Sequence, residues 1–518
     1  MPSVAIGMPL ALDVNWPADP APALARVLDK HRFVLFGLLA AFYLAGFNGQ
    51  WQLEPDSALY LTLGRNIALG RGYTYHGLPH DLAYPGLPYA LSVVFRVFGS
   101  HAIAAADLLM ILFGWAMIAC TYRLIDLAYD RPTAVVVALG VGISHELFRY
   151  CDEIMTDVPF AAGVAAFLAG YQGLFGSQAQ RRGRHWWDAA LLVIGLVIVL
   201  FTRPTMIGLL AAWAGAVVWA AIRRRGFNRW RLAATAIGIG ALAAILMLDP
   251  RRGAHHWGGG DYETYAFSAI TANLRQRLTT DVPANLADLL FGGTAARAFF
   301  GLPLGVWWLN AFFGSIPLIA AIALIRANAL WGLWVLMTLG MMALLVSHDR
   351  YLLQIMPLMV LGWWQFISAV GRRSWRGFQG AIFALLLALG TLPNLCACGI
   401  VVVHQHMAPF LAGYKNGHMI AYVQAAQCVS AHTAPGDIIV VPEKMSRIVT
   451  FLSDRIVEEE TEFHGGPAGA NWFVLLDRDD AQYVRWLASQ HIVAVGPPLE
   501  KISRPGQSPL KFSRATKD

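Results

Sequence analysis

The stretch DAALLVIGLVIVLFTRPTMIGLLAAWAGAVVWAAI, residues 188–222, decides the fold of this chain. It contains two long apolar runs, at about 188–202 and 204–222, which are separated only by the short break Thr202-Arg203-Pro204. Apolar runs of roughly this length are typical of helices that cross a bilayer. The stretch therefore predicts two tightly connected transmembrane helices, with one arginine placed at their junction.

The rest of the chain repeats this pattern. Hydrophobic residues make up 57% of the 518 residues, mean hydropathy is +0.51, and only 14% are charged, whereas soluble domains average about 25% charged residues. We therefore expect one polytopic membrane core of about eleven helices rather than several soluble domains. The other predicted spans are 33–48, 102–123, 133–147, 158–175, 232–248, 303–325, 329–346, 352–370 and 377–403.

The arginines predict the sidedness of this core. They gather in every second loop, as the orientation rule for membrane proteins requires, so the +7 formal charge does not indicate nucleic-acid binding. Residues 1–31 are too long for an ordinary signal-peptide leader, and we expect them to form a cytoplasmic segment. Residues 32–403 then form the transmembrane domain, and an odd number of spans places residues 404–518 outside the cytoplasm.

Two further regions have their own patterns. Segments 57–69 and 86–98 are helical in pattern but too short or too polar to span, so we expect them on the outer membrane surface. The last 115 residues predict a small α/β domain, with short strands at 437–441, 472–476 and 492–495 and helices at 417–432 and 479–490. The pair Cys396-Ala397-Cys398 lies inside an apolar run, which disfavours a disulfide framework or a zinc site.

Charged side chains at the predicted outer face are the candidates for chemistry. Glu54 and Asp56 follow the first span. The segment SHELFRYCDEIMTDVPF, residues 144–160, brings five titratable groups into one loop, and the last of them is Asp157. Helix capping is the structural alternative for Asp56 and Asp157, since each precedes an apolar helix. The two interpretations are compatible, because a capping carboxylate can also face a cavity.

The outer face also contains cations. Arg203 and Arg350 both lie on the side away from the other arginines. Snorkelling to lipid headgroups is the structural alternative for each. A planar guanidinium is also well suited to phosphate oxygens, so two arginines beside carboxylates indicate a phosphorylated lipid as ligand.

The run EPDSALYLTLGRNIALGRGYTYHGLPHDLAYPGLPYALSVVFRVFG, residues 54–99, resembles the first outer loop of the GT-C class of polyprenyl-phosphate-sugar-dependent membrane glycosyltransferases. The resemblance is to the aminoarabinose-transferase and protein O-mannosyltransferase-like branch. It rests on Asp56, Tyr60, Gly72-Tyr73, Tyr84-Pro85 and Phe98-Gly99, together with the patches at 156–160, 202–204 and 350–353. Pro55 separates the two acids, and Ala83-Tyr84-Pro85-Gly86 has no lysine, so the looser family-39-like transferases of bacterial envelope glycans are closer in pattern.

The resemblance implies an enzyme of the bacterial inner membrane whose active site is extracytoplasmic. It would move a sugar, with inversion, from a polyprenyl phosphate to an envelope glycan, lipid or protein. Asp56 would be the general base, Asp157 the second carboxylate and Glu54 a substitute. Arg203, Arg350 and Tyr351 would bind the donor phosphate, and Tyr60, Tyr73, Tyr84 and His348 would contact substrate. Some members use a divalent metal and others do not, and no decisive ligand set is present here.

Two other functions compete with this interpretation. A transporter or flippase of lipid-linked substrates would also need many helices, but its charges would normally lie near mid-membrane. A polysaccharide polymerase or ligase shares the outer site and the donor, and Arg251, Arg252, His255 and His256 in a long outer loop would suit it. The carboxylates in outer loops favour group transfer over transport.

Overall fold

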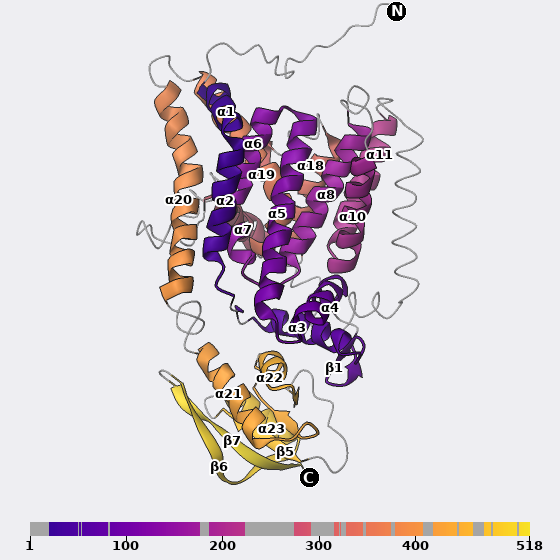
Figure 1. Ribbon diagram of the computed structural model, residues 1–518, viewed down its shortest axis with the longest axis vertical. Helices are drawn as coiled ribbons and strands as arrows, with labels where there is room; N and C mark the ends of the chain where they lie inside the picture. Colours follow the sequence, from indigo (N-terminus) through magenta and orange to yellow (C-terminus); the bar gives the residue numbers. More distant parts are fainter. Residues whose placement is uncertain are drawn as a thin grey trace, which may run out of the picture.

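The computed structural model consists of a helical bundle and a smaller α/β domain below it (Figure 1). The residues that the structure describes are 20–49, 51–52, 54–80, 83–176, 186–222, 274–291, 315–316, 318–320, 322, 328–344, 349–373, 379–407, 418–442, 445–458, 471–477, 480–504 and 507–517. The predicted span 232–248 and most of 303–325 lie outside these residues, as does the 251–256 loop.

The bundle confirms the fold class as mostly helical. Its main helices are α2 (Arg32–Gly46), α5 (Ile103–Ala128), α6 (Arg131–Gly142), α8 (Asp157–Phe175), α10 (Trp186–Thr202), α11 (Met206–Ile222), α18 (Ala329–Leu344), α19 (Met356–Arg373) and α20 (Gln379–Met407). Within the described part of the chain, four helical segments are long and apolar enough to cross a membrane. The count of eleven spans is therefore not confirmed.

One predicted span of the bundle is wrong in its bounds, and one helix was not predicted. The predicted span 133–147 is too long: α6 ends at Gly142, Ser144 is extended, and a separate short helix α7 (His145–Tyr150) follows. The predicted cytoplasmic segment 1–31 contains the helix α1 (Pro20–Lys30), which packs against α6. A search for apolar runs misses α1 because this helix is amphipathic, with one apolar and one polar face, and is not apolar as a whole.

The first loop after α2 forms a compact unit at one end of the bundle. It contains α3 (Pro55–Ala68), a small antiparallel hairpin of β1 (Thr74–Tyr75) and β2 (Leu78–Pro79), and α4 (Gly86–Phe98). Pro55 occupies the start of α3, where its missing N–H has no helical partner to lose. A Cβ atom on Gly86 would lie 2.6 Å from the carbonyl oxygen of Phe201, so only glycine lets α4 begin this close to the end of α10.

The small domain is an α/β unit around one mixed sheet, ordered β4-β3-β5-β7-β6. β3 pairs in parallel with β4 and β5, whereas β7 pairs antiparallel with β5 and β6. The strands are β3 (Ile438–Val440), β4 (Ile456–Glu458), β5 (Trp472–Leu476), β6 (Ile492–Arg504) and β7 (Gln507–Lys517), and the helices are α21 (His418–His432), α22 (Ser446–Ser453) and α23 (Ala481–Ser489).

This sheet is larger than the sequence predicted. The strands β4 and β7 and the helix α22 were not predicted, and β6 continues nine residues past the predicted end at Val495. A register shift between Val495 and Glu500 interrupts the alternation there, which hides the strand from a search for period-two patterns. Ile439 and Val440 belong to different apolar clusters, so both faces of the sheet are covered by helices.

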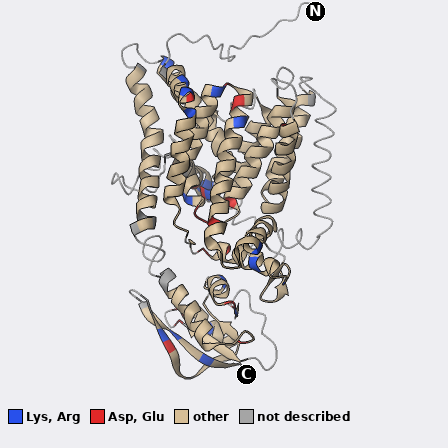
Figure 2. Cartoon of the chain, in the orientation of Figure 1, with Lys and Arg blue, Asp and Glu red and all other residues tan. Residues whose placement is uncertain are grey.

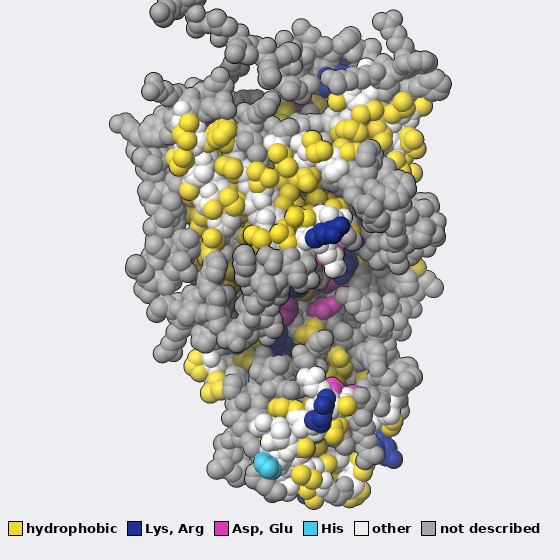
Figure 3. All heavy atoms as spheres, turned by 180° about the vertical axis from the view of Figure 1, so that it is seen from behind, with side chains coloured by type: hydrophobic (Ala, Val, Ile, Leu, Met, Phe, Trp, Pro, Cys, Tyr) yellow, Lys and Arg dark blue, Asp and Glu magenta, His cyan; other side chains and the backbone are white. Residues whose placement is uncertain are grey.

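The outer surface of the bundle is apolar over most of its height. Figure 2 shows few charged residues along the middle of the helices, and the view from behind shows hydrophobic side chains spread across the bundle (Figure 3). Phe33, Leu112 and Leu385 are more than half exposed. Exposed apolar side chains are unfavourable in water but favourable beside lipid chains, so this surface is suited to the interior of a bilayer.

Candidate active site

Asp56 and Asp157 come together at the end of the bundle that faces the small domain. Asp56 lies in the first turn of α3, and Asp157 is the first residue of α8. The residue that precedes α3 is Glu54 and the residue that precedes α8 is Thr156, so neither aspartate occupies the capping position of its helix. Their carboxylates are instead turned towards arginines.

The predicted arginines flank one aromatic ring. Arg203 forms an ion pair through Nη1 with Oδ1 of Asp157, and its guanidinium lies 4.5 Å from the centre of the Tyr351 ring. The guanidinium of Arg350 lies 5.4 Å from the same ring, and its Nη1 is 3.7 Å from Oδ2 of Asp56. Five residues predicted as site residues are therefore neighbours, although they come from four separate segments of the chain.

Burial strengthens these interactions. The Asp157 side chain is 1% exposed and that of Arg203 is 12% exposed. Burial is the largest influence on the pKa of Arg203 and lowers it, but the Asp157 carboxylate, with Tyr351 and Tyr60 beside it, raises that pKa above its ordinary value. Arg203 is therefore a permanent cation in a poorly hydrated place, where a charge acts strongly on a neighbouring anion.

Tyr60 completes this group on the side of α3. Its hydroxyl group is hydrogen-bonded to the side chain of Thr156, the residue before Asp157. Burial raises the pKa of Tyr60, and the charge of Asp56 raises it further. Tyr60 thus keeps its proton at neutral pH and links α3 to the start of α8.

One member of the site was not predicted from the sequence. Arg447, in α22 of the small domain, places Nη1 3.1 Å from Oδ1 of Asp56. Asp56 therefore lies between Arg350 of the bundle and Arg447 of the other domain. Asp56 and Arg447 are 391 residues apart in the chain, and no local spacing could have revealed this pair.

Several other predicted residues have different surroundings. Tyr73 donates a hydrogen bond to the carbonyl oxygen of Ala83 and stacks on Tyr89, and Tyr84 packs against the bundle core. These contacts stabilise the first loop, and a substrate role for either tyrosine stays a prediction. The backbone of Glu54 accepts a hydrogen bond from Ser57 at the start of α3. His348 lies outside the described residues.

The acidic loop before α8 forms a second cluster around a cation that the sequence analysis did not single out. Arg149 of α7 contacts Glu153 at 3.3 Å, Asp349 at 3.7 Å and Glu146 at 3.8 Å. Tyr150 also donates to Asp349, and Gln52 donates to Asp152. The signal was present, since Glu146 and Glu153 stand three residues before and four residues after Arg149, on one face of a helical segment.

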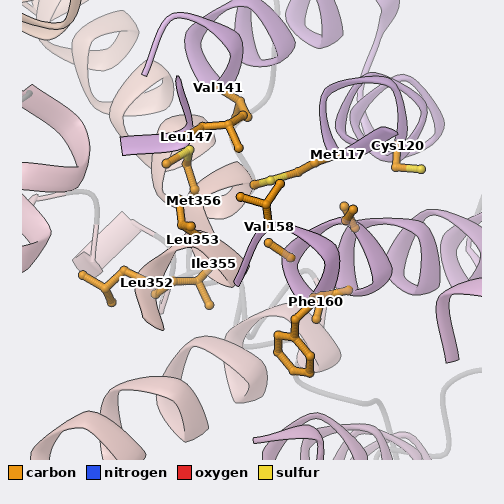
Figure 4. Packing of buried hydrophobic residues seen from close by; sticks show 14 of the residues in the cluster. Met117, Cys120, Val141, Leu147, Val158, Phe160, Leu352, Leu353, Ile355 and Met356 are labelled. Atoms are coloured by element: carbon orange, nitrogen blue, oxygen red, sulfur yellow. The ribbon is translucent and has the colours of Figure 1, made fainter. Parts of the chain in front are cut away.

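Buried apolar residues hold both ends of the site in place. The residues after Asp157 and after Tyr351 enter the bundle core directly (Figure 4). Val158, Leu352 and Leu353 are at most 1% exposed. The 3₁₀ helix η4 (Asp349–Ile355), which carries Arg350 and Tyr351, also contacts α8. The charged groups are thus attached to close-packed segments and keep a fixed geometry.

The described residues around Asp56 do not suit a divalent cation. Each carboxylate already faces at least one guanidinium, and three arginines would repel a metal ion from two aspartates. A group with metal-ligand spacing lies elsewhere, in the small domain, and consists of Cys428, His432 and Glu500. The sequence left a divalent metal open, and the charges around Asp56 argue against one at this site.

Comparison with solved structures identifies the fold. The crystal structure of ArnT from Cupriavidus metallidurans in the apo state matches with a TM-score of 0.61 over 93% of this chain and 98% of that chain. The fold is that of ArnT. The same protein bound to undecaprenyl phosphate matches with a TM-score of 0.58 over the same shares, and the identity is 11% in both cases.

Another match is an archaeal protein. The Archaeoglobus fulgidus oligosaccharyltransferase, solved with Zn and sulfate, matches with a TM-score of 0.52 at 14% identity, over 92% of this chain and 72% of that one. No family model and no curated protein matches the sequence. The resemblance to GT-C glycosyltransferases that the first loop indicated is thus confirmed at the level of the fold.

Proposed function

We propose that this protein is a membrane glycosyltransferase that moves a sugar from a polyprenyl phosphate to a hydroxyl group of an acceptor. The observation that supports this most is the convergence of Asp56, Asp157, Arg203 and Arg350 at one end of a bundle with the ArnT fold. A base beside buried cations is what transfer from a phosphate requires. The structure of ArnT with undecaprenyl phosphate supports this choice of donor.

The proposed reaction is a single displacement. Asp56 takes the proton of the acceptor hydroxyl group. At the same time the oxygen of that hydroxyl group attacks the anomeric carbon of the donor sugar. The bond between that carbon and the phosphate oxygen breaks, and the polyprenyl phosphate leaves with both electrons of the bond. Attack from the side opposite to the leaving group inverts the anomeric configuration.

The arginines act on the leaving group. Negative charge grows on the phosphate as the bond breaks, and preorganised guanidinium groups in a poorly hydrated site stabilise that charge. Arg203 is held for this role by Asp157 and by the ring of Tyr351. Asp157 is therefore proposed as the carboxylate that positions Arg203, and Glu54 as a neighbour that supports the start of α3.

We place the reaction on the extracytoplasmic side of a bacterial inner membrane. The arginine-rich loops alternate along the predicted core, and Asp56 and Arg203 lie in the other set of loops, which supports this sidedness. The acceptor would be an envelope glycan, lipid or protein on that side. The archaeal oligosaccharyltransferase tethered to an acceptor peptide supports the idea that this fold also accepts polypeptides.

The test is a reaction of the purified full-length protein in lipid vesicles with a polyprenyl-phosphate sugar. Transfer predicts release of the free polyprenyl phosphate, with the sugar recovered in a glycoside of inverted configuration. Movement of the intact donor between leaflets without cleavage would instead indicate a flippase. Growth of a sugar chain on the lipid donor would indicate a polymerase.

A further inference from the structure

We propose that Arg447 of the small domain binds the donor phosphate together with Arg350, so that docking of this domain completes the active site. This inference rests on the proposed function, since it assumes a phosphate-bearing donor. It adds a residue and a role for the small domain that the sequence analysis left open. The contacts of α22, the charge of the cluster and one unpaired guanidinium nitrogen support it.

The first support is the way in which α22 is fixed. Arg65 of α3 donates to the carbonyl oxygen of Phe451 at 2.8 Å and pairs with Asp454 at 3.0 Å. The side chains of Thr450 and His76 lie 3.1 Å apart, and Phe451 packs edge-on against Trp51. The small domain is thus attached to the first outer loop by specific contacts, of which the Arg65–Phe451 hydrogen bond is buried.

The second support is the spacing within α22. Arg447 precedes Thr450 and Phe451 by three and four residues, so the three side chains lie on one face of the helix, which ends just before Asp454. This is the face that contacts α3, and Arg447 occupies its end nearest to Asp56. The side chain is 25% exposed, so a ligand can still reach it.

The third support is electrostatic. Arg203, Arg350 and Arg447 face Asp56 and Asp157, which leaves one excess positive charge among the described members of the cluster. Nε of Arg350 is buried and has no hydrogen-bond partner among the residues that the structure describes. A buried donor without a partner is costly, and an anion that accepts from it removes that cost. A phosphate group has the charge and the number of oxygens to contact both Arg350 and Arg447.

The experiment compares binding of polyprenyl phosphate and polyprenyl alcohol to the purified full-length protein. The wild type should prefer the phosphate. The R447Q variant should bind the phosphate about 10- to 100-fold more weakly, which is the worth of one hydrogen bond to a charged group, with unchanged affinity for the alcohol. In turnover, the same variant should raise KM for the donor and leave KM for the acceptor unchanged.

A matched control and a conservative variant complete the design. R455Q makes the same change in the same domain, where Arg455 contacts Thr433 and not the site, and should bind like the wild type. R447K keeps the charge but not the planar guanidinium group, and its affinity for polyprenyl phosphate should fall by about 3- to 10-fold. Wild-type phosphate affinity in R447Q, or in R447K if R447Q does not fold, would overturn the proposal. A wild type that does not distinguish phosphate from alcohol would instead overturn the proposed function.

Discussion

Two arginine–carboxylate clusters lie side by side at the same end of the bundle, and they differ in charge balance. In the described part of the chain, the Asp56 cluster contains three arginines and two carboxylates, and Nε of Arg350 has no hydrogen-bond partner there. In the Arg149 cluster, one guanidinium contacts Glu146, Glu153 and Asp349. Asp349 and Arg350 are consecutive, so the two clusters are joined through η4.

This difference separates a binding site from a structural contact. A cluster with excess positive charge and one unpartnered N–H donor can bind an anion, whereas an arginine surrounded by acids already has its partners. Removing a group from the first cluster should therefore change transfer, and removing one from the second should change stability. The following substitutions test that division.

The largest expected effect is that of D56N on turnover. The change keeps the volume and removes the proposed base, and general-base catalysis typically contributes about 10²- to 10⁴-fold. The rate of polyprenyl phosphate release should fall by that factor while the melting temperature stays close to that of the wild type. Near-normal turnover would exclude Asp56 as the base.

R149M should have the largest effect on stability. It leaves Glu146 and Glu153 buried without their cation, and breaking a buried ion pair from one side costs about 3–5 kcal/mol. Thermal or denaturant unfolding in detergent measures this loss. The exposed Arg71 provides the control, since R71Q should cost less than about 1 kcal/mol. Unfolding of R149M at the wild-type temperature would argue against a structural role.

R350Q should lower kcat by about 10²- to 10³-fold, the usual cost of removing one donor to a developing oxyanion. The expected signature is a loss in transfer from the phosphate donor with little loss of folded protein, which is the reverse of R149M. If R71Q lowered kcat as much as R350Q, the loss would not be specific to Arg350, and its proposed role at the phosphate would be contradicted.

The smallest expected effect is that of E153Q. Arg149 keeps Glu146 and Asp349 as partners, and the cluster loses one of its excess negative charges. Stability should fall by less than in R149M, because the amide that replaces the carboxylate can still accept a hydrogen bond from Arg149, and transfer should be unchanged. The same variant serves as the isosteric control for D56N, so a large loss of turnover in E153Q would remove the distinction between the clusters.

The sequence located much of the site because its residues stand at the ends of apolar runs. Asp157 precedes α8, Arg203 separates α10 from α11, and Arg350 with Tyr351 precedes α19. Helix ends can be read from hydropathy, since a charge is disfavoured inside a span. Residues away from such ends, such as Tyr73 and Tyr84, could not be assigned by this signal.

The sequence missed what depends on packing between distant segments. Arg149 was overlooked because its spacing to Glu146 and Glu153 matters only once α7 is known to be a helix separate from α6. Arg447 was overlooked because α22 is short and amphipathic and resembles many surface helices. The sheet was underestimated for a similar reason, since the irregular middle of β6 breaks its alternation.

The sequence by itself determined the membrane character of the chain, the positions of most described helices and the charged residues at their ends. These follow from the free energy of transferring side chains out of water, which is a local property. Only the tertiary structure decided that Arg203 pairs with Asp157 and that Arg447 reaches Asp56. Such pairs depend on how close-packed helices and a docked domain orient groups hundreds of residues apart, and no local pattern contains that information.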